Sequence, residues 1–136
     1  MSLLPTQTLH GEPFISTRES IAWIPSTPAF EDSDVLVLSS RSTSPGGVGA
    51  TLLYLDLRLS LPLDRGSTLN WGLAGLRHTL STSPARHRWD HSTIDSRDDG
   101  AADEGEVVQR DGIEIETGIM LNPPTGQKEA YEEIWR

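Results

Sequence analysis

The chain of 136 residues carries a formal net charge of −9 and contains no cysteine. This length suffices for one domain with a hydrophobic core, so residues 1–136 are expected to form a single domain. The acidic charge argues against nucleic-acid binding and against an anionic membrane surface, and the lack of cysteine excludes disulfides and thiolate chemistry. The sequence shows neither a signal peptide nor an apolar run of transmembrane length, which favours a cytoplasmic protein.

The first fifty residues predict short strands separated by turn-rich segments. Residues 14–17 and 21–24 are each candidates for a short strand, although the second also fits a single helical turn. Residues 34–39 form a β-branched apolar run that is typical of a buried strand. The next segment, 40–49, is rich in serine, glycine and proline and predicts a flexible loop.

The clearest alternation in the chain covers residues 51–63. One face carries a leucine at every odd position from 53 to 63, and the other carries Leu52, Tyr54, Asp56, Arg58 and Ser60. A period of two over this length predicts a long strand with one buried side. Asp56 and Arg58 form either a solvated surface pair or a pair that faces a barrel lumen, and both interpretations stay open.

The middle of the chain predicts two further strands and an acidic loop. Residues 70–75 indicate a short strand, and residues 85–94 alternate with His87, Trp89 and His91 on one face. On a strand, histidines four residues apart are separated by roughly 13 Å, so they cannot share an ion and no metal site is expected. Glycine-rich nucleotide signatures are missing as well, so no cofactor is expected. The acidic segment 95–105 predicts a mobile loop.

The last third of the chain predicts a three-stranded meander. Asp111-Gly112 between two alternating runs is a strong hairpin signal, and the proline- and glycine-rich segment 122–126 marks a second turn. A strand that is hydrophobic inside and polar outside would place Glu114 on the solvent face. For Glu116 both faces remain open.

These elements together predict an all-β fold. Eight to nine short antiparallel strands in a chain of this size favour closure into a small barrel, because closure removes exposed strand edges. A barrel of about eight strands has an interior large enough for side chains or for one small ligand.

The barrel interior is expected to collect aromatic and acid–base side chains. The polar groups predicted to guide a reaction through a hydrogen bond or a proton are His91, Arg58 and Tyr54. The side chains predicted to contact a ligand are Trp71, Trp89, Asp56, Glu116, Tyr131 and Trp135, and Glu133 is a further acid–base group. For each tryptophan, core packing is the competing interpretation.

Several motifs resemble the fungal Hri-type family between Val35 and Arg136. They comprise residues 53–58, the segment Asn-Trp-Gly-Leu-Ala-Gly at 70–75, residues 88–96, the Glu-Thr-Gly at 116–118 and the Glu-Glu-Ile-Trp at 132–135. The resemblance implies a lipocalin-like fold, and the family is named for interaction with a casein-kinase-type protein kinase. Longer members carry two barrel-like domains, so this chain is expected to be a single-domain version. The resemblance supplies no catalytic residues.

Two functions from different classes follow. The first is an enzyme of fungal secondary metabolism that binds a small, mainly apolar metabolite and guides a cofactor-independent cyclisation, cycloaddition or dehydration. The second is a non-catalytic interaction protein that contacts its partner through the acidic segment 95–106 or an apolar patch. An open, aromatic-lined lumen favours the first function, and a packed interior beside an exposed apolar patch favours the second. Either function is compatible with a homodimer.

Overall fold

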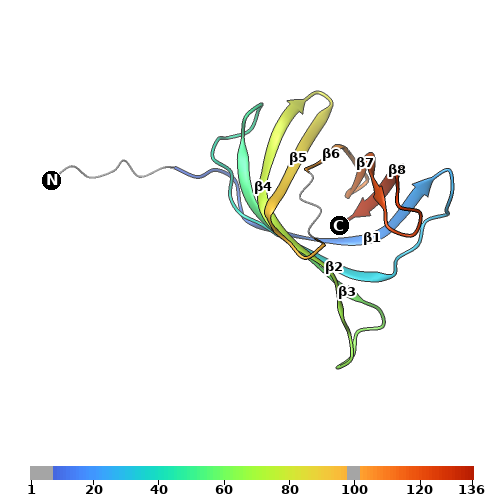
Figure 1. The fold of residues 1–136 in the computed structure, drawn as a ribbon. Coiled ribbons are helices and arrows are strands. Elements are labelled where there is room, and N and C mark those ends of the chain that lie inside the picture. Colours follow the sequence, from blue (N-terminus) through green and yellow to red (C-terminus); the bar gives the residue numbers. More distant parts are fainter. Residues whose placement is uncertain (1–7, 98–101) are drawn as a thin grey trace.

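The computed structural model describes residues 8–97 and 102–136, and these residues form a closed antiparallel β-barrel (Figure 1). In them, eight strands follow one another around the barrel in sequence order, and β8 pairs with β1 to close it. The strands are β1 (Phe14–Ile24), β2 (Ser33–Ser39), β3 (Thr51–Ser60), β4 (Leu69–Thr82), β5 (Ala85–Asp95), β6 (Asp103–Arg110), β7 (Ile113–Asn122) and β8 (Gln127–Trp135). The prediction of a small, lipocalin-like barrel of eight to nine strands is therefore confirmed.

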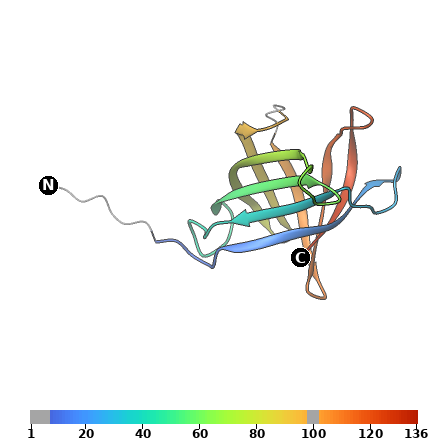
Figure 2. The same cartoon turned by 90° about the horizontal axis from the view of Figure 1, so that it is seen from below.

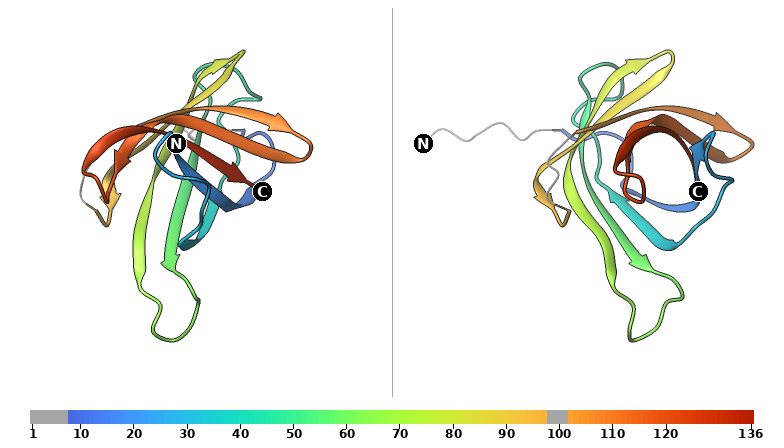
Figure 3. Two further views of the ribbon diagram at one scale, coloured as in Figure 1. Left: turned by 90° about the vertical axis from the view of Figure 1, so that its right-hand side faces the viewer. Right: turned by 45° about the vertical axis from the view of Figure 1, so that its right-hand side comes forward.

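The predicted C-terminal meander is present as β6, β7 and β8. Asp111 and Gly112 both have positive φ angles, 52° and 81°, as a hairpin turn of this sequence requires. The second turn is closed by a hydrogen bond of 2.8 Å that the Gly126 amide donates to the Asn122 carbonyl. Figure 2 shows β1 to β4 side by side on one side of the barrel, with the meander on the other, and Figure 3 shows β8 beside β1.

Strands β1 and β4 are much longer than their sequence patterns indicate. The two candidate segments at 14–17 and 21–24 form one continuous strand, β1, and β4 extends well beyond residue 75. The predicted loop 95–105 is wrong at both ends, because β5 includes Asp95 and β6 begins at Asp103. Positions 98–101 of that loop lie outside the described residues. The last four residues of the proposed partner-binding segment 95–106, from Asp103 to Glu106, therefore belong to a strand.

Strand β3 has one buried side, and it is the side of mixed polarity. The buried positions are the even ones, Leu52, Tyr54, Asp56 and Arg58. The odd-numbered leucines point outward, and Leu53 is 62% exposed. Of the two interpretations left open by the sequence, the lumen-facing pair Asp56–Arg58 is the one that the fold adopts.

The core consists of separate apolar clusters. One combines Leu52, Tyr54, Trp71 and Leu73 from β3 and β4, and the other combines Ile21, Trp23 and Tyr131 from β1 and β8. Among the described residues no helix has the length and apolar character that a membrane span needs.

Gly75 lies where the pairing of β4 with β5 shifts register, between Ala74 and Leu76. A Cβ atom at this position would lie 1.7 Å from the backbone oxygen of Asp90. The same oxygen accepts a hydrogen bond of 3.2 Å from the Tyr54 hydroxyl. Gly75 thus allows β5 to approach β4 closely and brings a backbone acceptor within reach of β3.

Candidate functional site

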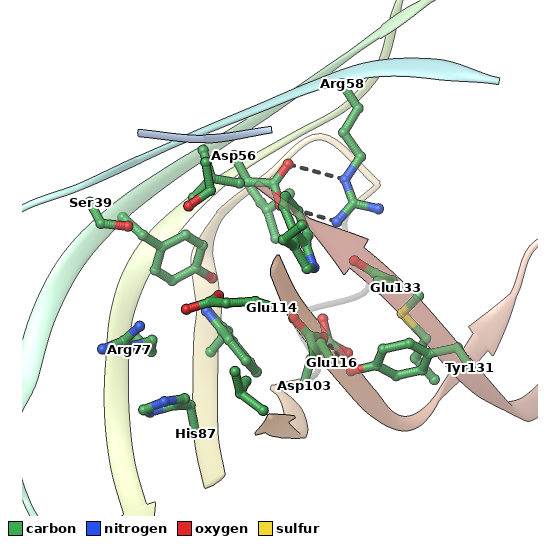
Figure 4. A pocket seen from close by; sticks show the side chains of 18 of the residues that line it. Ser39, Asp56, Arg58, Arg77, His87, Asp103, Glu114, Glu116, Tyr131 and Glu133 are labelled. Carbon is green, nitrogen blue, oxygen red and sulfur yellow. Dashed lines mark hydrogen bonds and ion pairs between the residues drawn. The ribbon is translucent and has the colours of Figure 1, made fainter. Parts of the chain in front are cut away.

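A cavity lies inside the barrel, and all eight strands contribute side chains to its wall (Figure 4). The centre of a water-sized sphere can move through about 90 Å³ of it, and the cavity is partly open to solvent. Because a single water needs only about 10–15 Å³ by this measure, the space accommodates several waters or a small organic molecule.

The structure brings together most of the side chains that the sequence analysis selected. Seven of the nine line the cavity, namely Tyr54, Asp56, Arg58, Trp89, Glu116, Tyr131 and Trp135. The other two, Trp71 and His91, lie outside the lining and pack against each other edge to face, with ring centroids 5.7 Å apart. Glu133, the further acid–base group, also lines the cavity.

Asp56 and Arg58 form a bidentate ion pair on β3. The Arg58 guanidinium donates hydrogen bonds of 3.0 and 3.1 Å to the two carboxylate oxygens of Asp56. Burial alone would lower the pKa of Arg58, but Asp56 and Glu133 outweigh burial and raise it. The guanidinium also lies 4.8 Å from the centroid of the Trp71 ring, as in a cation–π contact. Arg58 is therefore a permanently charged part of the cavity wall.

His91 is held between two carboxylates. Its Nδ1 lies 2.6 Å from Asp95 Oδ2 and its Nε2 lies 3.1 Å from Asp103 Oδ2, while its side chain has no exposed surface. Asp95 also accepts a hydrogen bond of 2.6 Å from the Trp71 indole. This arrangement ties β4, the end of β5 and the start of β6 together, and it supports the cavity wall from behind.

Two glutamates face each other across β7 and β8. Glu116 is the direct strand partner of Glu133, and both line the cavity (Figure 4). The Tyr131 hydroxyl donates a hydrogen bond of 2.6 Å to Glu116 Oε2. Burial, followed by the neighbouring Glu133 charge, raises the pKa of Glu116 well above its ordinary value, and burial also raises the pKa of Glu133. The pair can therefore hold a proton at a pH where surface glutamates have lost theirs.

Two glycines make room for the contact between Tyr131 and Glu116. A Cβ on Gly118 would lie 2.8 Å from the Tyr131 hydroxyl oxygen, and a Cβ on Gly105 would lie 2.9 Å from the same atom. Gly105 and Gly118 are strand partners on β6 and β7. The Glu-Thr-Gly motif thus has a structural role, since its glycine leaves room for the Tyr131 ring and for the backbone oxygen of Glu104, which would lie 2.6 Å from a Cβ there.

We expect the stabilities of wild type and Glu116→Gln to diverge as pH rises. Folded protein retains a proton on Glu116 that the unfolded chain loses above the ordinary pKa of 4.5, so wild-type unfolding free energy falls with increasing pH. The variant lacks this contribution and should gain up to about 1.4 kcal/mol per pH unit relative to wild type. Urea unfolding between pH 4 and 8 measures the difference. Glu132→Gln, on the exposed face of β8, is the control. If the unfolding free energies of Glu116→Gln and wild type changed with pH in parallel, the raised pKa of Glu116 would be contradicted.

Several cavity residues were not selected from the sequence, namely Arg77, His87, Asp103 and Glu114. The prediction that Glu114 faces solvent is wrong, because the hydrophobic-inside rule presumes an apolar interior and this interior is polar. His87 and Glu114 could have been predicted, because each lies two residues before a selected residue, Trp89 or Glu116, and therefore on the same face of its strand. Arg77 and Asp103 are the strand partners of Trp89, so only the register reveals them. Burial, followed by the Arg77 charge, lowers the pKa of His87 to about 4, which keeps it neutral at pH 7.

Three cavity-lining residues present buried polar atoms that have no hydrogen-bond partner in the described part of the chain. They are Arg77 Nε, Glu133 Oε2 and Trp135 Nε1. A buried polar atom without a partner costs about 1–3 kcal/mol, so such atoms usually meet water or a ligand. In residues 8–97 and 102–136 no group of three or more histidine, aspartate or glutamate side chains is arranged to hold a metal ion.

Comparison with known proteins gives one match. The family model described as Protein HRI1 matches residues 14–136, which include all eight strands. Neither a curated protein nor a solved structure matches the chain. The matched range contains every motif on which the sequence resemblance rests. The chain therefore belongs to the Protein HRI1 family.

Proposed function

We propose that the barrel binds a small organic metabolite in its cavity and guides a cyclisation, cycloaddition or dehydration that needs no cofactor. The observation that carries the proposal is the set of unpartnered polar atoms on the wall of a partly open cavity. Tyr54, Trp89 and Trp135 offer apolar surface to the body of the ligand. The polar groups fix its orientation, which is how a preformed cavity selects one reactive geometry.

Glu116 is the best-placed proton donor for such a reaction. Its raised pKa lets it hold a proton at a pH where an exposed glutamate has lost its own, and its contact with Tyr131 fixes the orientation of the carboxyl group. A positioned general acid of this kind contributes about 10²–10⁴-fold to a rate. Arg58 and Tyr54 supply fixed positive charge and a hydroxyl, and His91 acts through the wall that it supports.

Titration of the purified protein with small aromatic and polyene metabolites tests binding, with tryptophan fluorescence as the readout. Saturable quenching is expected, because Trp89 and Trp135 line the cavity. Product analysis of each quenching compound then tests turnover, and Glu116→Gln should lose about 10²-fold or more of the rate at a saturating concentration of that compound. A folded protein that no compound quenches would rule out the binding function. Quenching without any product would restrict the protein to ligand binding.

A different observation favours the second function, an interaction protein. The outer surface of β2 to β5 carries an apolar face, here called the leucine face, in which Leu38, Leu55, Ala74 and Ile94 form a row of strand partners. Leu53, Leu59, Leu69 and Leu76 extend the row, and Leu53 and Leu69 are 62% and 51% exposed. Two copies that each carry −9 repel elsewhere but can meet at an uncharged surface. We propose that a second copy of this chain covers the leucine face.

We expect Leu55→Arg to abolish this self-association, because it places a charge at the centre of the leucine face. Sedimentation velocity between about 1 and 100 μM measures the mass. The matched control is Ile119→Arg, which changes an aliphatic residue of β7 that is 65% exposed on another part of the outer surface, and it should leave the mass unchanged. A wild-type protein that stays monomeric throughout would exclude the homodimer and leave the face to a different protein.

A further inference from the structure

We infer that the cavity ligand carries an ammonium-type cation that binds between Glu116 and Glu133. This inference rests on the proposed function, since it specifies the chemistry of the molecule that the cavity takes. The position is set by the sheet itself: the two glutamates are direct strand partners on β7 and β8, and both point into the cavity (Figure 4).

Glu133 provides an acceptor that no protein donor uses within the described residues. The residue is 2% exposed, and its Oε2 has no hydrogen-bond partner there. Its other oxygen, Oε1, lies 3.7 Å from Arg18 Nη1, which is too long for a hydrogen bond. Arg18 instead donates bonds of 2.8 and 2.9 Å to Glu31. A buried carboxylate oxygen that belongs to a cavity-lining residue and has no donor is a candidate acceptor for a cationic donor.

The arginine of the cavity wall that most favours ionised Glu133, Arg58, is already hydrogen-bonded to another carboxylate. Arg58 donates hydrogen bonds to both oxygens of Asp56, so Asp56 already offsets part of its positive charge. On the other side, Tyr131 donates its only hydroxyl proton to Glu116 Oε2. The two glutamates thus share the charges of Arg58 and Arg18 with Asp56 and Glu31. Directly opposed like charges also destabilise a strand pair. A bound cation would remove that repulsion.

The surroundings of the two glutamates suit a small amine with an apolar body. Met120, Tyr131 and Trp135 line the cavity from β7 and β8, and they offer soft or aromatic surface to the carbon skeleton. Aromatic rings also attract a cation by about 0.5–2 kcal/mol when water is excluded. A primary ammonium donates three hydrogen bonds, which matches carboxylate oxygens on two facing strands.

Charged groups on other strands tune the pair and predict a pH dependence. The pKa of Glu116 is raised by burial, by Glu133 and by Asp103 of β6, and the Tyr131 bond and Arg58 oppose them. Near Glu133, Arg58 and Arg18 favour the ionised form, whereas Asp56 and Glu31 disfavour it. An amine binds the ionised carboxylates, so its affinity should rise between pH 5 and pH 8, while a neutral ligand should show no such rise.

Three probes of similar shape separate charge from shape: phenethylamine, phenethyl alcohol and 3-phenylpropanoate. Amide chemical-shift titrations of the wild-type protein at pH 7 give the dissociation constants. The amine is expected to bind at least about tenfold more tightly than the alcohol and the carboxylate, as hydrogen bonds to charged groups imply. Its affinity should also rise from pH 5 to pH 8.

Two substitutions test the position. Glu133→Gln keeps the size of the side chain and should weaken amine binding about tenfold or more, with little change for the alcohol. Glu116→Gln gives the same test from the facing strand should the first variant fold poorly. The control, Glu132→Gln, removes the same charge from the neighbouring, outward-facing position of β8 and should leave amine binding unchanged.

The outcomes distinguish the inference from the proposed function. The inference that the ligand carries a cation is wrong if the alcohol or the carboxylate binds as tightly as the amine or more tightly. It is also wrong if neither substitution changes the affinity for the amine. If none of the three probes binds while other metabolites quench the tryptophans, the cation is overturned and the binding function stands. If no compound quenches the tryptophan fluorescence and none of the three probes binds, both the inference and the proposed binding function are wrong.

Discussion

Gly75→Ala is expected to destabilise the barrel severely. The new methyl carbon would lie 1.7 Å from the Asp90 carbonyl oxygen, a backbone atom that no rotamer change can move away. Relief requires separation of β4 from β5 at the register shift, which also breaks the hydrogen bond from Tyr54 to Asp90. We expect a loss of at least about 3 kcal/mol of unfolding free energy, the upper part of the range for overpacking. Urea unfolding followed by tryptophan fluorescence measures it.

Gly72→Ala is the matched control on the same strand. A Cβ at Gly72 meets only side-chain atoms of Leu69 and Leu57, at 3.3 Å or more, and these can rotate away. Its effect should stay within about 1 kcal/mol, since alanine also lowers the entropy cost of ordering a strand glycine. Equal destabilisation by the two substitutions would show that the close approach of Asp90 to Gly75 is not what makes the glycine necessary.

Arg58→Leu is expected to cost about 3–5 kcal/mol of unfolding free energy. The substitution leaves the Asp56 carboxylate buried without its bidentate partner, and a broken buried ion pair costs about this much. It also removes the positive charge that most favours ionised Glu133. The same unfolding assay at pH 7 gives the value.

A double variant separates loss of the pair from loss of packing. Asp56→Asn combined with Arg58→Leu removes both charges, so it should recover part of the stability that Arg58→Leu loses. The surface pair of Arg41 and Glu12, separated by 3.5 Å, provides the control, and Arg41→Leu should change stability by no more than about 0.5 kcal/mol. A double variant less stable than Arg58→Leu alone would indicate that the arginine stem matters more than its charge.

The positions of most strands could be predicted from the sequence, because the turns that separate them depend on a few neighbouring residues. The Asp111-Gly112 hairpin requires positive φ at two consecutive residues, and the sequence provides residues that tolerate it. The alternation at 51–63 likewise predicted β3. In contrast, β4 was predicted too short, because Gly72 and Gly75 interrupt the pattern of a strand that other strands hold in place on both sides.

The alternation could not reveal which face of a strand points inward. A period of two divides β3 into leucines and mixed polar residues, and the usual rule buries the apolar set. This barrel buries Asp56 and Arg58 instead, because the ion pair satisfies both groups inside a polar lumen. The same inversion explains why Glu114 was misplaced. The contact between His91 and Asp103 could not be predicted for another reason: it depends on the register of β5 and β6, which the sequence pattern does not give.

The pairing of β1 with β8 has a consequence for the order in which the protein folds during synthesis. Arg18 pairs with Trp135, so the ring closes only after the last strand has emerged from the ribosome. Until then β1 and β7 each present an open edge. Contacts so far apart in sequence also slow folding. The nascent chain therefore passes through an open sheet whose unpaired edges are prone to aggregation, and a chaperone would help most at this stage.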